Sequence, residues 1–131
     1  MEESTEFVVD ASSLLSYLMP DEQTSEFLQS LIERHVVKDI AIIGPKLLPF
    51  EVANTLRVGI LRKRISLTKA KELMREFMDL EIELFDTDFM SAISAANRHN
   101  LSVYDASYLE LAKSRKSKLV SFDERLMELA N

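Results

Sequence analysis

Two aspartates enclose a helix and a strand near the end of this 131-residue sequence. Asp105 opens an expected helix over residues 105–116, and Asp123 follows an expected strand over residues 119–122. In an open parallel sheet, chemistry collects outside the carboxyl ends of the strands, where these two acids can converge. Carboxylates ~4 Å apart repel by about 4 kcal/mol at an effective dielectric of about 20, and a bound cation relieves that repulsion. The unit therefore predicts half of an acidic site.

Two further acids are candidates for the other half. Asp10 directly follows the apolar run at residues 7–9, which is typical of a buried parallel strand. Its placement therefore matches that of Asp123. Glu51 lies near the start of an expected long helix over residues 48–64, where a solvated glutamate is equally ordinary.

Each of these acids also has a structural interpretation that requires no chemistry. Aspartate is among the best N-cap residues, so Asp10 is able simply to cap the helix that follows it. Ser102 and Asp105 have nearly the spacing of a capping box. Asp86 and Asp88 also lie at a strand-to-helix junction. Position alone is therefore not diagnostic, and the chemical interpretation depends on several acids coinciding at strand ends.

Alternating strands and helices must position these acids. Short apolar runs predict four strands, at residues 7–9, 40–43, 81–85 and 119–122. Apolar residues at helical spacing predict helices at residues 11–19, 21–37, 48–64, 66–80, 89–100, 105–116 and 123–129. This alternation indicates an α/β fold with three layers (α/β/α) and a central parallel sheet of four or five strands. Without a linker or repeat, residues 1–131 are expected to form a single domain.

Composition and charge narrow the class of protein. A chain of 131 residues buries roughly two-thirds of its unfolded surface in one core. No apolar run approaches the ~18 residues of a membrane helix, and the acidic start Met1-Glu2-Glu3 is opposite in charge to a secretory leader, so we expect a cytoplasmic protein. The absence of cysteine excludes disulfides and thiolate metal sites. The net charge of -6 argues against a general nucleic-acid coat, but it leaves room for an acidic metal site with local basic residues.

Four short motifs follow one another along the chain. They are V-V-D-A-S at residues 8–12, E-V-A-N at 51–54, Y-D-A-S-Y-L at 104–109 and S-F-D at 121–123. Each is weak alone, whereas all four in this order, in a chain of this size, are a fairly specific signal. The sequence resembles the PIN-domain nucleases, and within them the VapC-type toxins of toxin–antitoxin pairs. The resemblance covers nearly the whole chain and implies a PIN-like fold.

The resemblance also implies which residues carry the activity. The implied catalytic acids are Asp10, Glu51, Asp105 and Asp123. The implied polar supports are Ser12, Asn54 and Ser121. Asp86 and Asp88 match no catalytic position. The fourth acid is the most variable element of the family's pattern.

A divalent cation is expected at this site, because four carboxylates in one cleft cannot all stay ionised without one. Oxygen ligands without cysteine, with both histidines on other segments, suit Mg²⁺ or Mn²⁺ rather than Zn²⁺. Such an ion lowers the pKa of a bound water and stabilises an in-line displacement at phosphorus. We expect Asp10 and Asp105 to bind the metal directly. Glu51 and Asp123 would bind through water, hold a second ion or orient the nucleophile.

The implied substrate is RNA, single-stranded or looped, and the implied protein partner is a small antitoxin that blocks the acidic cleft. Candidate phosphate contacts are Arg57, the basic cluster Arg62, Lys63 and Arg64, and the basic residues within 113–118. Solvated helix ends explain these basic residues equally well.

A homodimer is expected from the helix at residues 66–80. Its apolar residues are Leu73, Met74, Phe77 and Met78, more than one core face requires. The alternative interpretation is a helix that is simply well buried.

Two other functions remain open at this point. A phosphoacceptor receiver domain is also a small, acidic, doubly wound protein, in which Asp86 would accept the phosphate. That class needs paired acids after its first strand and a lysine after its last, whereas this chain has only Asp10 there and places Lys118 before its last strand. A catalytically silent PIN-like binding module is the other candidate, and the presence of all four acids argues against it. Metal-dependent RNA cleavage separates the nuclease from both alternatives.

Overall fold

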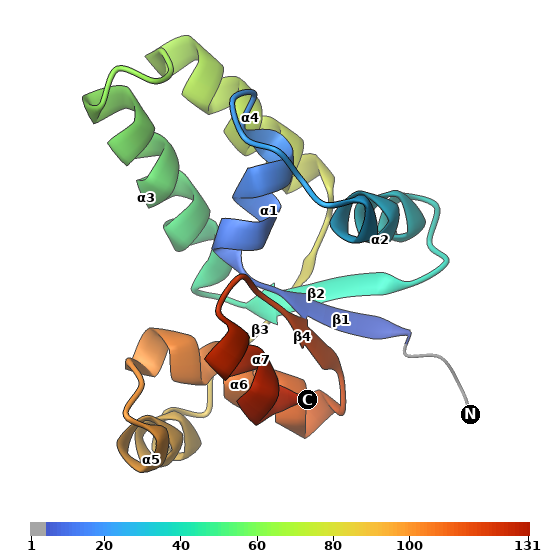
Figure 1. Cartoon of the computed structure of the whole chain (residues 1–131), viewed down its shortest axis with the longest axis vertical. Helices are drawn as coiled ribbons and strands as arrows, with labels where there is room; N and C mark the ends of the chain where they lie inside the picture. Colours follow the sequence, from blue (N-terminus) through green and yellow to red (C-terminus); the bar gives the residue numbers. More distant parts are fainter. Residues whose placement is uncertain (1–4) are drawn as a thin grey trace.

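The computed structural model describes residues 5–131 and places four short parallel strands between two layers of helices (Figure 1). The strands are β1 (Glu6–Val9), β2 (Ala41–Pro45), β3 (Glu83–Phe85) and β4 (Lys118–Val120). The helices are α1 (Ala11–Leu18), α2 (Glu26–Val36), α3 (Leu48–Leu61), α4 (Leu67–Asp79), α5 (Phe89–His99), α6 (Val103–Arg115) and α7 (Glu124–Ala130). The predicted three-layer α/β/α fold is confirmed, with a sheet of four strands. The acidic start at residues 1–3 lies outside the described residues.

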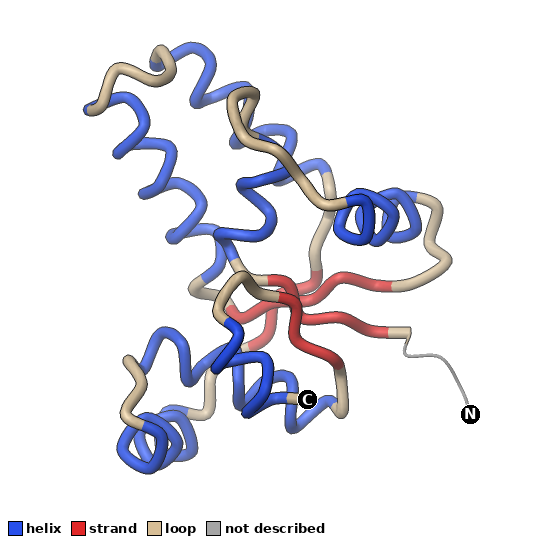
Figure 2. The backbone as a smooth tube through the Cα atoms, in the orientation of Figure 1, coloured by secondary structure: helices blue, strands red, loops and turns tan. Residues whose placement is uncertain are grey.

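The strand order β3-β2-β1-β4 shows how the chain is wound. It builds outward from β1 through β2 to β3, and then returns to add β4 on the other side of β1. Helices α1 to α4 lie on one side of the sheet, and α5 to α7 lie on the other (Figures 1 and 2). The reversal creates a topological switch point at the carboxyl ends of β1 and β4, the usual place for a ligand in such sheets.

The strands β1 and β4 end at the same level. Val9 pairs with Val120 in the parallel register, and the backbone N–H of Asp10 donates to the carbonyl oxygen of Val120 at 3.2 Å. The segments that follow the two strands therefore start side by side at the switch point.

The core lies on both faces of the sheet. Val8 and Ile43 in the strands are fully buried, as is expected for parallel strands that are covered on both sides. Leu14 of α1 and Leu109 of α6 are also fully buried. Burial of such a side chain stabilises the fold by about 1.5–3 kcal/mol. The site at the switch point is therefore built on a closely packed base. Within residues 5–131, no helix is long and apolar enough to cross a membrane.

Helix α6 begins earlier than predicted and helix α2 begins later, because a serine caps each of them. Helix α6 begins at Val103 and not at Asp105, since the Oγ of Ser102 accepts a hydrogen bond from the Asp105 backbone N–H at 3.0 Å. Helix α2 begins after Ser25, whose Oγ accepts a hydrogen bond from the backbone N–H of Leu28 at 3.1 Å. Asp105 therefore lies within the first turn of its helix, and it is not the cap.

Strand β4 is shorter than expected. It ends at Val120, so Ser121 and Phe122 separate it from Asp123. Asp123 caps α7, because its Oδ1 accepts a hydrogen bond from the backbone N–H of Leu126 at 3.0 Å. The acid that follows β4 is therefore also the N-cap of α7.

The apolar residues of α4 are mostly used within the monomer. Leu73 and Phe77 are buried and Met74 is half-buried, whereas Met78 is 63% exposed. The interpretation of α4 as a well-buried helix therefore fits the structure. The homodimer remains a prediction, but α4 supplies only Met78 as a large exposed apolar residue among these four.

Candidate active site

Asp10 begins the site, immediately after β1. It is the N-cap of α1, and its Oδ1 accepts hydrogen bonds from the Ser13 backbone N–H and the Ser12 hydroxyl, each at 3.0 Å. Both bonds use the same oxygen, and Oδ2 accepts no hydrogen bond from residues 5–131. The capping interpretation of Asp10 is thus correct, and it still leaves one carboxylate oxygen free to bind a ligand.

Glu51 lies in the first turn of α3 and is half-buried. Its Oε1 accepts a hydrogen bond of 2.6 Å from the hydroxyl of Tyr108. Burial raises the pKa of Glu51, the negative charges of Asp10 and Asp105 raise it further, and the Tyr108 bond opposes the change. Glu51 is therefore within electrostatic range of both aspartates.

Asp105 is half-buried and occupies the first turn of α6. Burial raises its pKa, the charges of Asp123 and Asp10 raise it further, and a hydrogen bond with Ser102 opposes the change. Asp105 therefore interacts with all three of the other predicted acids, since it also acts on Glu51. The four predicted acids are therefore linked through Asp105, which lies within electrostatic range of the other three.

The donor set fits Mg²⁺ or Mn²⁺. Among residues 5–131, no three His, Cys, Asp or Glu side chains are grouped closely enough to hold one ion together. Mg²⁺ does not require such a group, because it keeps several waters and usually binds proteins through one or two carboxylates. Asp10 and Asp105 meet that requirement, because their carboxylates repel each other and Asp10 has a free oxygen.

Neither histidine belongs to this donor set. The Nδ1 of His35 accepts from the Ile42 backbone N–H at 2.9 Å, and its Nε2 lies 2.6 Å from the Leu80 carbonyl oxygen. These contacts join α2 to β2 and to the end of α4. His99 lies in the last turn of α5. Neither histidine is among the groups that shift the pKa of Glu51 or of Asp105.

Two of the three predicted polar supports contact the acids. Ser12 donates to Asp10, as described above. Ser121 is buried, and its Oγ accepts from the Asp123 backbone N–H at 3.0 Å, which fixes the start of α7. Asn54 is exposed, and its side chain makes no hydrogen bond with the described residues. The role predicted for Asn54 therefore has no contact to support it.

The predicted phosphate contacts lie away from the acids. Arg62 and Lys63 follow the C-terminal end of α3, about 16 Å along the helix axis from Glu51 at a rise of about 1.5 Å per residue. Arg64 forms ion pairs with two carboxylates of the α1–α2 connection, Asp21 at 2.8 Å and Glu22 at 3.4 Å.

Two other sets of basic residues complete the comparison. Arg57 is exposed on α3 and lies about 9 Å along the axis from Glu51, so it is the nearest of the predicted contacts on this helix. The basic residues within 113–118 surround the C-terminal end of α6, whereas Asp105 lies in its first turn. They are therefore at the opposite end of that helix from the acids.

Tyr108 and Ser102 contact the acids, although neither was predicted as a site residue. The signal for Tyr108 is its spacing, because it lies three residues after Asp105 and so shares a face of α6 with it. The signal for Ser102 is its near capping-box spacing to Asp105. The sequence does not reveal the partner of Tyr108, because Glu51 is 57 residues away.

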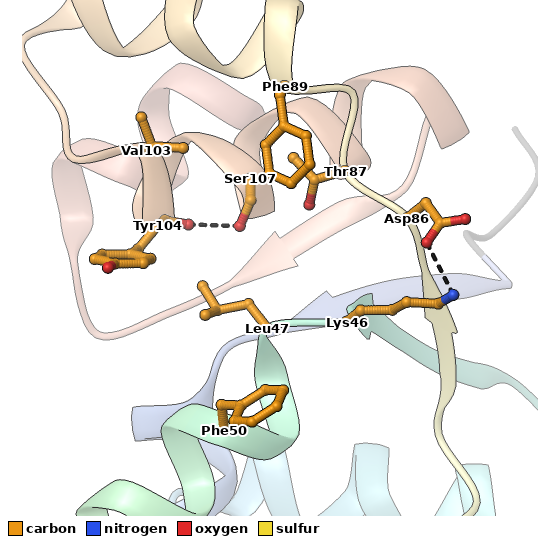
Figure 3. Close-up of a pocket in the computed structure, with 9 residues that line it drawn as sticks. All are labelled: Lys46, Leu47, Phe50, Asp86, Thr87, Phe89, Val103, Tyr104 and Ser107. Carbon is orange, nitrogen blue, oxygen red and sulfur yellow. Dashed lines mark hydrogen bonds and ion pairs between the residues drawn. The ribbon is translucent and has the colours of Figure 1, made fainter.

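An apolar cavity of about 550 Å³ lies between the start of α3, the start of α5 and α6 (Figure 3). Phe50, Phe89 and Tyr104 give it an aromatic lining from α3, α5 and α6, and Phe50 is 77% exposed. The exposed ion pair between Lys46 and Asp86, with an N···O distance of 2.8 Å, lies at one side. Phe50 and Tyr104 directly precede Glu51 and Asp105, so the cavity adjoins the acidic site.

A doubly wound sheet with acids gathered at its switch point defines the class of α/β proteins that bind ligands at their strand ends. The sequence matches the PIN domain over residues 7–131, a span that includes all four acids. The chain therefore belongs to the PIN-domain family.

Individual relatives narrow this assignment. The chain is 31% identical over 125 residues to ribonuclease VapC3 from Pyrobaculum aerophilum, a match covering 92% of each chain. It is 31% identical over 122 residues to VapC ribonuclease Mb0985 from Mycobacterium bovis, covering 92% of this chain and 88% of the relative. The crystal structure of PAE2754 from Pyrobaculum aerophilum matches with a TM-score of 0.75 at 21% identity, covering 97% of this chain and 81% of the other. The resemblance to VapC-type proteins is confirmed, and the structural match supports the fold.

Proposed function

We propose that this chain is a hydrolase, a Mg²⁺- or Mn²⁺-dependent endoribonuclease, and the toxin of a toxin–antitoxin pair that acts in the cytoplasm. The observation that carries the proposal is the gathering of four acids at the switch point. Burial and the neighbouring carboxylates raise the pKa of Glu51 and of Asp105 there. The names of the VapC relatives support RNA as the substrate.

The residues divide the work as follows in this proposal. Asp10 and Asp105 would hold the ion, which when bound supplies Lewis acidity and a bound water of lowered pKa. Glu51 is held at one oxygen by Tyr108, which leaves its other oxygen to orient a water. The N-termini of α1 and α6 open at the same edge, and their partial positive charge favours a phosphate there.

The first test of the function is the dependence of cleavage on metal. The purified protein should cut a 5′-labelled single-stranded RNA when Mg²⁺ or Mn²⁺ is present at about 5 mM, a concentration chosen to exceed the dissociation constant of the metal. EDTA should stop the reaction. A reaction that proceeds unchanged in EDTA would contradict the metal-dependent mechanism. Binding of RNA without any cleavage would instead support the silent PIN-like module.

The phosphoacceptor alternative loses its structural basis. Asp86 follows β3, which is an edge strand in the order β3-β2-β1-β4, and the carboxylate is already paired with Lys46. The switch point, where a ligand is expected, lies at β1 and β4. Membership of the PIN-domain family is also incompatible with that class.

Two protein partners belong to the proposal. The antitoxin is a protein that covers the acidic cleft, and a cognate protein should therefore abolish cleavage when it is added in equimolar amount. A homodimer is the other assembly, and the exposed aromatic residues around Phe50 favour that face over α4. Light scattering should report a dimer for the wild type and for Met78→Asp, and a monomer for Phe50→Asp. A monomeric wild type at micromolar concentration would refute the dimer.

A further inference from the structure

Tyr108 places a polar group where the surrounding structure requires only an apolar one. Its side chain is 2% exposed and packs in the main core with apolar residues such as Leu109 and Leu111 of the same helix. A phenylalanine would fill the same space. A buried hydroxyl is unfavourable unless it has a hydrogen-bond partner, so the partner of this hydroxyl is informative.

The partner is an acid of the site. The Tyr108 hydroxyl donates to Glu51 Oε1 at 2.6 Å, a length typical of a strong bond to a carboxylate. The backbone N–H of Ala11 also acts on this hydroxyl, and it lowers the pKa of Tyr108, which burial and Glu51 raise. Ala11 directly follows Asp10, so one phenol oxygen lies between two acid-bearing segments.

These contacts join elements from both sides of the sheet. Asp10 and α1, and Glu51 and α3, belong to one layer, while Tyr108 and Asp105 belong to α6 in the other layer (Figure 1). Tyr108 lies one turn after Asp105 on the same face of α6. A bond from Tyr108 to Glu51 therefore sets the position of one acid relative to another across the switch point.

We propose that Tyr108 is a positioning residue for the acidic site. It holds Glu51 by Oε1, so that Oε2 is the oxygen presented to the cation and its waters, and it fixes the distance between α3 and α6 at the level of the acids. Tyr108 itself touches neither substrate nor metal. The inference rests on the proposed function, because it assigns Glu51 a place in the metal site.

The test uses Tyr108→Phe, which keeps the ring and removes the hydroxyl. Melting temperatures measured across a Mn²⁺ titration give the metal affinity, and RNA cleavage gives kcat and KM. Loss of a partner that orients a metal-site residue typically costs about 10–100-fold, so we expect the Mn²⁺ affinity and kcat of Tyr108→Phe to fall within that range. KM for RNA should change less than about 3-fold, because the RNA contacts remain.

A matched control and a double variant separate positioning from packing. Tyr17→Phe removes the hydroxyl of a partly exposed tyrosine on α1 and should leave the Mn²⁺ titration unchanged. In a Glu51→Ala background, adding Tyr108→Phe should cause no further loss of Mn²⁺ affinity, because Tyr108 acts through Glu51.

Three results would overturn the inference. The first is a Tyr108→Phe protein whose Mn²⁺ titration and kcat equal those of the wild type. The second is an equal loss in both backgrounds, which would show that Tyr108 acts through packing and not through Glu51. The third is a wild type that does not respond to Mn²⁺, which removes the proposed function together with the inference. The first two results leave the nuclease proposal intact.

Discussion

Two groups of acids lie at strand-to-helix junctions of this sheet. They differ in burial, in the charge of their neighbours and in their hydrogen-bond or ion-pair partners. At the switch point, burial and neighbouring carboxylates raise the pKa of Glu51 and Asp105. At the end of β3, hydrogen bonds from the backbone and hydroxyl of Ser91 lower the pKa of Asp88. Asp86, whose side chain is 85% exposed, has Lys46 as its partner. No positively charged residue is among the causes of the pKa changes of Glu51 and Asp105. Asp86 and Asp88, in contrast, already have an ion-pair or hydrogen-bond partner.

The comparison shows that capping does not identify a functional acid. Asp10 and Asp88 both cap their helices, each accepting from the N–H three residues later and from a nearby serine hydroxyl, but Asp10 uses one oxygen for both bonds whereas Asp88 uses both of its oxygens. A second difference between them is topological. Asp10 follows a strand at the switch point, where other acids converge, whereas Asp88 follows an edge strand.

The largest expected difference between the groups is in activity. Asp10→Asn should reduce RNA cleavage by more than about 100-fold, because loss of a direct ligand exceeds the 10–100-fold cost of losing a residue that only supports one. Asp88→Asn should stay within about 2-fold, because asparagine is an equally good N-cap. The measurement is the initial rate of cleavage in Mn²⁺. Similar losses in both variants would erase the distinction drawn above.

Thermal stability should separate the two groups by sign. Asp105→Asn removes a repelling charge, so it should raise the melting temperature of the metal-free protein and abolish the upward shift caused by Mn²⁺. Asp88→Ala removes a cap and should lower the melting temperature by a few degrees, while the Mn²⁺ shift remains. Calorimetry with and without Mn²⁺ measures both effects. A metal-free Asp105→Asn protein that melts below the wild type would mean that Asp105 has a mainly structural role.

The dependence of stability on pH should follow from the same difference. Because the pKa of Glu51 and of Asp105 is raised on folding, their contribution is favourable at low pH and is lost as the pH rises through their folded values. The melting temperature of the metal-free wild type should therefore rise as the pH is lowered from neutrality toward the ordinary carboxylate range near about 4.

A control fixes the origin of that slope. The lowered pKa of Asp88 has the opposite sign, since its contribution is lost only as the pH falls below the ordinary aspartate range near about 4. Asp105→Asn should flatten the rise that the wild type shows as the pH is lowered from neutrality toward about 4, whereas Asp88→Asn should not. Equal slopes in the wild type and in Asp105→Asn would place the pH dependence elsewhere.

The smallest effect is expected for the ion pair at the end of β3. Lys46→Ala breaks the contact with Asp86, but both side chains are largely exposed, so the free energy of unfolding should change by no more than about 0.5 kcal/mol. Urea denaturation measures this change. A loss above about 1 kcal/mol would show that this pair, too, is an organised part of the fold.

The sequence was sufficient for features that depend on local pattern. Apolar runs identified all four strands, and Asp10 directly follows β1 as expected, whereas two residues separate Asp123 from the shorter β4. Both acids still follow carboxyl ends at one edge of the sheet. The cap of α6 is Ser102 and not Asp105. The predicted cap of this helix was therefore placed three residues too late, although the capping pattern itself was recognised.

Contacts between residues that are far apart in the chain could not be predicted from the sequence. The Tyr108–Glu51 bond spans 57 positions, and the pairing of Arg64 with Asp21 spans 43. The second contact pairs one member of the basic cluster with a carboxylate. The distance of Arg62 and Lys63 from Glu51 follows from the length of α3, which no local motif reveals.

The single oxygen with which Asp10 serves both Ser12 and Ser13 has a practical consequence for working with this protein. An amide at position 10 keeps the acceptor that starts α1 and removes only the charge. In a saturation-mutagenesis survey, asparagine should therefore stand apart as the folded but silent allele, whereas alanine would score as both inactive and poorly expressed. Such an allele is the natural bait for isolating uncut transcripts, and it is the form that an expression host should tolerate.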